Sequence, residues 1–145
     1  MRTHRQSYRH ADLRALILIA GLLVPAVSIL AATPADIRAS LEASARQGKA
    51  PFGGFSAQRG RDFFTTRIDG LACASCHTDN PVNPGRHAKT GKDISPLAPA
   101  ADPRRFTDAA RVEKWFRRNC NDVLNRECTA QEKGDVLEYL LSLAR

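Results

Sequence analysis

The feature that most restricts how this chain can fold is a pair of cysteines, Cys73 and Cys76, followed at once by His77. Two thiols at this spacing can bond to the vinyl groups of a haem while the imidazole ligates its iron. On one helical turn the three side chains face the same side. The alternatives are a disulfide, a redox-active cysteine pair and half of a zinc site. The motif predicts one covalently bound haem c.

The first 32 residues predict export. Residues 1–14 carry four arginines and one acidic side chain, and an apolar run over 15–30 ends in the small residues Ala31 and Ala32. This order is typical of a secretory signal peptide, residues 1–32. The apolar run is shorter than the roughly 20 residues of a spanning helix. We therefore expect a bacterial periplasmic protein that contacts the membrane only through an uncleaved signal.

The remaining 113 residues suit one small domain. A hydrophobic core of this size is marginal by itself, and a haem would supply apolar surface for helices to pack around. Without the signal peptide the net charge falls from +7 to +4, because residues 1–32 hold four arginines and one aspartate. No nucleic-acid motif is present, so we expect no nucleic-acid partner.

Residues 33–55 predict a helical arm followed by a connector. Thr33 is placed to cap a helix with Pro34 in its first turn, and Gly48 stops it. The apolar stripe of this helix is weak, so we expect a peripheral arm that packs loosely. The connector then leads to the main domain, residues 56–145.

A glycine in the second predicted helix, residues 56–66, predicts a close helix crossing. Gly60 costs a helix up to about 1 kcal/mol relative to alanine, so it needs a packing reason. The expected partner is the last helix, which begins at a capping box from Thr129 to Glu132. Such a crossing beside the Cys-x-x-Cys-His turn resembles class I cytochrome c. The expected fold is all-α, a small helical domain wrapped around one haem.

The segment 78–105 contains five of the eight prolines and little periodicity. An irregular segment of that length needs something to wrap, and the edge of a haem is such an object. Basic side chains in this segment are candidate partners for the haem propionates. They are Lys89, Lys92, Arg104 and Arg105.

The ligand on the far side of the iron is less constrained. A helix is predicted from residue 107 or 108 to about 120, and Asn119 ends its apolar stripe. Burying an amide without a partner costs about 1 to 3 kcal/mol, so Asn119 needs one: the helix terminus or iron. The only methionine is Met1, in the signal, which excludes His/Met ligation in the mature protein. The sixth position is left to His87, Asn119, a lysine, water or nothing.

Two further cysteines, Cys120 and Cys128, are expected to pair in an oxidising compartment. Along a continuous helix their Cα atoms would lie about 12 Å apart, beyond the roughly 7 Å limit of a disulfide. The chain must therefore turn back after Asn119. The bond would pin the helix end that carries this residue.

The stretch 59–143 resembles the SHP-type monohaem cytochromes c, oxygen-binding relatives of class I cytochrome c. The shared motifs lie at residues 73–77, 90–92, 96–99, 105–108, 110–115, 118–121 and 128–129. The resemblance implies that Asn119 ligates ferric iron and leaves on reduction so that small gases bind, and that Cys120 pairs with Cys128. The chain departs from the family pattern in a shorter segment between positions 64 and 73 and in a histidine at position 87.

Of the two candidate ligands we favour Asn119 over His87. Asn119 would lie on a rigid helix beside Trp115, which we expect to pack on the haem. His87 follows His77 by only ten residues and would have to pass around the haem edge. A neutral amide would bind Fe(III) better than Fe(II) and leave the reduced iron open.

Four possible functions follow. The first is a periplasmic electron carrier with a switchable haem that binds O2, NO or CO and is reduced by another cytochrome, such as a dihaem c-type or membrane b-type protein. The second is a haem enzyme acting on O2, NO or peroxide, for which only His87 offers a distal acid or base. The others are a bis-histidine carrier using His87, and a zinc module. That module would use Cys73, Cys76, Cys120 and Cys128. We favour the first, a non-enzymatic protein.

The predicted helix 107–120 also carries a basic face that could dock an acidic redox partner, adding mainly to the association rate, or could simply be solvated. Its members are Arg111, Lys114, Arg117 and Arg118.

Overall fold

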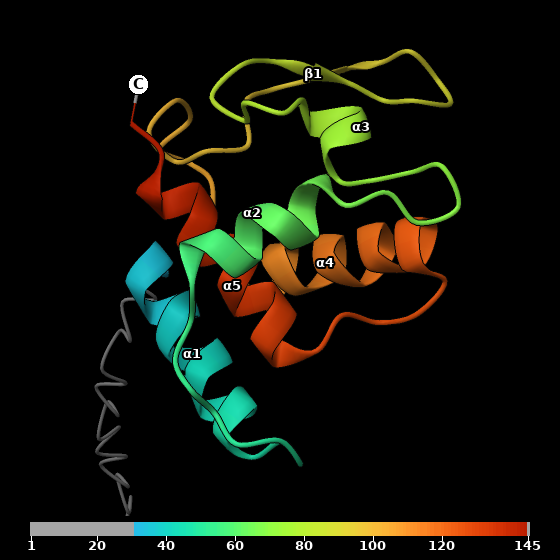
Figure 1. Ribbon diagram of the computed structural model, residues 1–145. Coiled ribbons are helices and arrows are strands. Elements are labelled where there is room, and N and C mark those ends of the chain that lie inside the picture. The colour runs from blue at the N-terminus through green and yellow to red at the C-terminus, as the bar shows by residue number, and fades with distance from the viewer. Residues whose placement is uncertain (1–30, 145) are drawn as a thin grey trace, which may run out of the picture.

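The computed structural model describes residues 31–144, so most of the predicted signal peptide lies outside it. Figure 1 shows a mainly helical molecule with one small antiparallel hairpin, which confirms the predicted all-α class. The elements are α1 Pro34–Arg46, α2 Ala57–Thr65, α3 Ala74–His77, β1 Gly85–Arg86, β2 Asp93–Ile94, α4 Ala109–Leu124 and α5 Ala130–Ser142. Within residues 31–144 no helix combines the length and apolar character needed to cross a membrane.

The centre of the fold is the crossing of α2 over α5, and Gly60 makes it possible. A Cβ atom at position 60 would overlap the backbone carbonyl oxygen of Asp135 on α5. The Asp135 carboxylate is buried and accepts hydrogen bonds from the Ser56 backbone N–H (2.7 Å) and from Arg59 Nε (2.9 Å). The predicted close approach of these two helices is confirmed.

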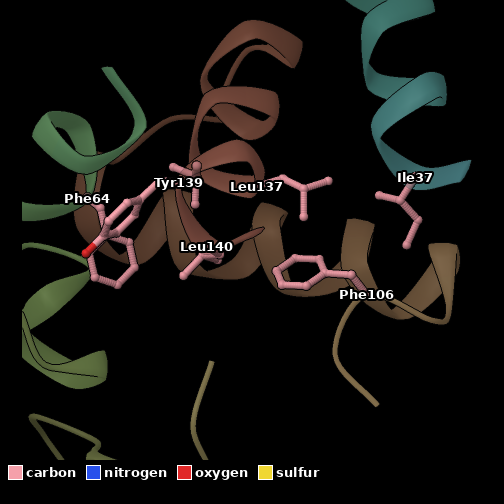
Figure 2. Packing of buried hydrophobic residues seen from close by; sticks show 7 residues of the cluster. Ile37, Phe64, Phe106, Leu137, Tyr139 and Leu140 are labelled. Atoms are coloured by element: carbon pink, nitrogen blue, oxygen red, sulfur yellow. The ribbon is translucent and has the colours of Figure 1, made fainter. Parts of the chain in front are cut away.

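The N-terminal helix α1 is not the loosely packed arm that its weak stripe predicts. Ile37 is only 5% exposed and belongs to the main core, which Figure 2 shows together with Leu137 and Phe106. Arg38 Nε also donates to a carboxylate oxygen of Glu138 on α5 at 2.7 Å. The prediction was wrong because one well-placed isoleucine and one ion pair attach a helix whose average hydrophobicity is low. The start of the helix is as predicted, with Thr33 as its N-cap.

The core lies between α2, α5 and the residues before α4. Phe64, Leu137 and Leu140 are almost fully buried, and the rings of Phe64 and Tyr139 lie 5.6 Å apart between centroids (Figure 2). Phe106, which precedes α4, completes the cluster. These side chains form one side of the space in which the candidate site lies.

Helix α4 extends further than predicted. Asp108 caps its start by accepting the backbone N–H of Arg111 at 2.9 Å. The helix continues through Leu124 and ends where Asn125 takes a left-handed conformation, with φ 54°. The helix therefore ends about one turn later than the predicted end near residue 120, and the chain turns back after Asn119 as expected, at Asn125, because asparagine tolerates the left-handed conformation at a helix end.

The predicted disulfide is present. Cys120 and Cys128 are joined, with their Cα atoms 5.6 Å apart. The bond links the last turns of α4 to the residue immediately before Thr129, the N-cap of α5.

The proline-rich segment 78–105 is ordered by local contacts. Pro81 is fully buried, and its carbonyl oxygen accepts the backbone N–H groups of Leu97 (2.9 Å) and Ala98 (3.0 Å). The hairpin of β1 and β2, with Gly85 opposite Ile94, was not predicted from the sequence. A Cβ atom on Gly85 would overlap the carbonyl oxygen of Cys76, so this hairpin lies directly against α3.

Candidate haem site

A cavity of about 780 Å³ lies between α3, the segment that follows it, α4 and the core. This volume is within the roughly 300–1,000 Å³ range of small-molecule and cofactor sites. Figure 1 shows α3 and the hairpin along the upper side of the molecule and α4 lower and apart from them. The residues that the sequence predicts around a haem all border the cavity. They are Cys73, Cys76, His77, His87, Trp115 and Asn119.

One short turn presents the two thiols and the imidazole together. The carbonyl oxygen of Cys73 accepts the backbone N–H groups of Cys76 (3.2 Å) and His77 (3.0 Å), and Ser75 Oγ accepts the N–H of Ala72 (3.0 Å). These bonds close a single helical turn. The predicted common face for the three side chains is therefore confirmed, since all three line one cavity.

The chemistry of the cysteines weighs against two alternatives. Cys73 and Cys76 are free thiols, and burial raises the pKa of Cys73 to about 11. A redox-active cysteine needs the opposite, a lowered pKa that stabilises the thiolate. The zinc module fails because Cys120 and Cys128 are bonded to each other, and residues 31–144 contain no cluster of three metal-ligating side chains.

His77 is held as a neutral imidazole. Burial, with a smaller contribution from the charge of Arg105, lowers the pKa of His77 to about 4. The neutral ring is the form that ligates iron. Its centroid lies 6.4 Å from that of Phe64, and neither ring nitrogen hydrogen-bonds to a protein group within residues 31–144. The imidazole nitrogens are thus available.

Asn119 borders the same cavity from α4. Its side chain is partly buried, and no hydrogen bond joins its amide group to any residue of the described part of the chain. The helix terminus is not its partner, because Asn125 ends the helix. An amide beside an apolar cavity without a protein partner is the kind of group that a bound cofactor would satisfy.

Trp115 is more exposed than its predicted packing role suggests. The residue is 46% exposed, and the cationic groups of Lys114 and Arg118 lie 6.0 and 5.5 Å from its ring centroid. It nevertheless borders the cavity. The ring therefore spans the boundary between the cavity and the basic surface of α4.

His87 lies near the turn of Cys73, Cys76 and His77, which we call the attachment turn, and its ring is held by hydrogen bonds. Its Nδ1 accepts the backbone N–H groups of Lys89 (3.2 Å) and Thr90 (3.3 Å), so the neutral ring carries its proton on Nε2. The next residue, Ala88, donates its backbone N–H to Cys76 Sγ at 3.3 Å. This histidine thus belongs to the wall that carries Cys76.

The four basic side chains predicted near the propionates border the cavity. Arg105 donates to the carbonyl oxygens of Ser95 and Pro96, both at 2.7 Å, and so holds the irregular segment in place. Arg104 Nε donates to Asp102 at 2.9 Å. The structural role of Arg105 was not apparent from the sequence, because its acceptors are backbone groups that any residue offers.

Sequence reasoning also missed the apolar walls of the cavity. Phe63 on α2, Ile94 on β2 and Leu97 are examples. The signal for Phe63 was available in its position next to the buried Phe64. No local signal marks Ile94, which reaches the cavity only because the hairpin forms.

The chain is similar to known proteins in sequence and in structure. Residues 50–140 match the family described as a domain of unknown function, DUF1924. The chain is 45% identical over 132 residues to the cytochrome c-type protein SHP of Cereibacter sphaeroides, covering 88% of this chain and 96% of that protein. It is also 48% identical over 82 residues to cytochrome c'' of Methylophilus methylotrophus, covering 57% of each.

The same two relatives are found among solved structures. The structure of oxidized SHP, an oxygen-binding cytochrome c, superposes with a TM-score of 0.68 and 43% identity over 78% of this chain and 99% of the other. The crystal structure of oxidized cytochrome c'' from Methylophilus methylotrophus gives a TM-score of 0.72 and 35% identity over 77% and 95% of the two chains. Its solution structure concerns the structural basis of haem-ligand detachment.

Proposed function

Because the chain belongs to the SHP family of c-type cytochromes and carries one covalent haem c, we propose that it is a periplasmic electron-transfer protein with a redox-switchable distal ligand. The observation that carries the proposal is the partnerless amide of Asn119 on the cavity that also receives Cys73, Cys76 and His77. The haem supplies one-electron exchange and, where its sixth position is open, binding of O2, NO or CO.

The attachment turn supplies the fixed side of the site. Cys73 and Cys76 would hold the haem through thioether bonds, and His77 would ligate the iron as a neutral imidazole. Burial keeps the pKa of His77 near 4, so the ring stays unprotonated at neutral pH. Phe64, almost fully buried behind this ring, restricts its movement.

Asn119 would supply the exchangeable side. Its neutral amide would bind Fe(III) better than Fe(II), so the side chain would leave when the iron is reduced. His87 is the weaker candidate because its Nε2 carries the ring proton while Nδ1 accepts two backbone N–H groups. The names of the relatives, an oxygen-binding cytochrome c and a cytochrome studied for haem-ligand detachment, are consistent with this exchange.

Carboxylates around the cavity favour a carrier over an enzyme. Asp102 is paired with Arg104 and Arg105, Asp108 caps α4, and Asp122 lies 3.9 Å from Arg118. Each is thus engaged in a structural contact, which leaves little for general acid or base catalysis.

The central test is spectroscopic. We expect the ferric protein to be low-spin and the dithionite-reduced protein to bind carbon monoxide completely, because Asn119 would have left the iron. Optical spectra before and after carbon monoxide addition measure this, and the colour should survive acid-acetone extraction if the haem is covalent. A ferrous protein that remains six-coordinate and ignores carbon monoxide would contradict the proposal.

The basic side chains of α4 would dock the electron donor, another cytochrome of the dihaem c-type or membrane b-type class. All four are exposed, and Trp115 lies among them at the edge of the cavity. Opposite charge on a partner would raise the association rate and align the two proteins. The four are Arg111, Lys114, Arg117 and Arg118.

Reversing two of these charges should slow electron transfer. In Lys114→Glu/Arg117→Glu we expect the second-order rate of reduction by an acidic c-type cytochrome to fall about tenfold at low salt and to lose most of its salt dependence. Stopped-flow at several KCl concentrations measures both. Lys49→Glu, which replaces another exposed lysine just beyond α1, is the control and should leave the rate nearly unchanged. If Lys114→Glu/Arg117→Glu and Lys49→Glu are reduced at the same rate, α4 does not carry the docking surface.

A further inference from the structure

We propose that the ion pair between Glu113 on α4 and Lys133 on α5 is a positioning pair that determines how firmly Asn119 is held at the iron. The inference rests on the proposed role of Asn119 as the distal ligand. It concerns two residues that lie outside the motifs of the attachment turn and the disulfide.

Helix α4 needs such a device because it is only lightly packed. Within residues 31–144 the extensive helix-to-helix packing joins α5 to α1 and α2, and α4 has no comparable partner. Its apolar contacts with the core come from Val112 and Phe116, which are only partly buried. Apart from the haem that would pack along it, the helix therefore depends for its orientation on the few specific links that it makes to α5.

The first specific link is the ion pair. Lys133 Nζ lies 2.8 Å from both carboxylate oxygens of Glu113. Lys133 is only 9% exposed, and Glu113 is its one carboxylate partner in the described part of the chain. A buried ammonium strongly favours keeping its counter-ion, because its charge is otherwise poorly solvated. The Glu113 side chain is 48% exposed, so water can reach the pair from one side.

The second link is the disulfide, which lies two helical turns from the ion pair along α4. Cys120 follows Glu113 by seven residues, which is two helical turns, so both lie along one line of α4. Their partners Cys128 and Lys133 lie together at the start of α5. A helix joined at Cys120 alone can pivot about that bond, whereas a second link two turns away fixes the direction of its axis.

Such a pivot would re-aim the side chain of Asn119. This residue precedes Cys120 and faces the cavity, on the side of α4 next to the line of the two links. Its backbone adjoins the pivot and would move little, but tilting of α4 after loss of the ion pair would turn the amide within the cavity. Contact of Asn119 with the iron would then be weakened, while the covalent attachment at Cys73 and Cys76 would be untouched.

The test uses the ferric holoprotein and cyanide, which must displace Asn119 to bind. We expect Glu113→Gln to raise cyanide affinity about threefold or more and to lower the low-spin EPR signal. The reason is that the state with Asn119 bound to the iron would be less populated and would compete less with cyanide. Lys133→Met, which removes the charge and keeps the apolar stem, should do the same. Carbon monoxide affinity of the ferrous form should change less than about twofold, because Asn119 is then off the iron.

Glu138→Gln is the matched control. It breaks the Arg38–Glu138 ion pair, whose atoms lie 2.7 Å apart and which attaches α1 rather than α4 to α5. Cyanide affinity should be that of the wild type. A rise equal to that of Glu113→Gln would overturn the inference, because it would show a general loosening of the fold.

Double variants separate the positioning role of Glu113 from the role of Asn119 as the distal ligand. In an Asn119→Ala background, Glu113→Gln should have no further effect on cyanide affinity. If Asn119→Ala raises the affinity and Glu113→Gln alone does not, or if Glu113→Gln acts equally without Asn119, the positioning role is wrong and the ligand assignment stands. If Asn119→Ala itself changes neither affinity nor spin state, the proposed function fails.

Discussion

Replacing Asn119 with alanine is expected to convert the ferric protein from low-spin to high-spin and to raise its cyanide affinity about tenfold or more. An internal ligand that occupies about nine-tenths of the molecules lowers the apparent affinity of a competitor by about tenfold, and the alanine variant removes that competition. Cys120 and its disulfide are unaffected, so α4 should stay in place. EPR at low temperature and optical titration with cyanide measure the two effects.

Two matched variants make this result specific. Asn121→Ala removes an exposed asparagine two positions further along α4 and should leave the ferric spectrum unchanged. His87→Ala should also leave the iron low-spin, because its ring is engaged with Lys89 and Thr90. A low-spin spectrum that persists in Asn119→Ala and is lost in His87→Ala would assign the sixth position to His87.

The second large effect is expected at the helix crossing. Gly60→Ala should lower the free energy of unfolding by about 2 kcal/mol or more, although alanine is the better helix former by about 1 kcal/mol. The new methyl group would overlap the backbone carbonyl of Asp135, which cannot rotate away as a side chain can. Overpacking of this kind costs about 1–3 kcal/mol and sometimes more, so the clash should outweigh the gain in helix propensity. Urea unfolding followed by far-UV circular dichroism measures the difference.

Gly53→Ala is the control for this substitution. Nothing lies within 4 Å of a Cβ atom built at position 53, so the variant should unfold at nearly the wild-type urea concentration. If Gly60→Ala is as stable as Gly53→Ala, α2 and α5 can separate at little cost. The close crossing would then not be a determinant of the fold.

Local sequence signals predicted the fold where the physical cause is itself local. The capping boxes at Thr33 and Thr129 define the starts of α1 and α5, since each needs only a side chain and a backbone N–H three residues apart. Gly60 predicted a long-range feature because a glycine in a helix is costly unless another backbone comes close. The attachment turn was predictable because its cause is also local: its three functional side chains lie on one helical turn.

Other features were missed because their partners are distant in sequence. The packing of α1 depends on the fit of Ile37 between side chains about a hundred residues away, which average hydrophobicity does not report. The end of α4 was misplaced by one turn because a disulfide limits only the distance between its two cysteines, and either turn position satisfies it. The hairpin beside α3 depends on Gly85 lying against Cys76.

The sequence by itself determined the chemistry of this protein: two thiols and an imidazole within five residues, no methionine after Met1, and an asparagine directly before a cysteine. Only the tertiary structure decided how these groups are used. It places Asn119 on the cavity of His77 without a protein partner among residues 31–144, and it engages His87 Nδ1 with the backbone N–H groups of Lys89 and Thr90. Residue types and short spacings are properties of the chain, whereas the availability of a lone pair depends on which groups the fold brings within hydrogen-bonding distance.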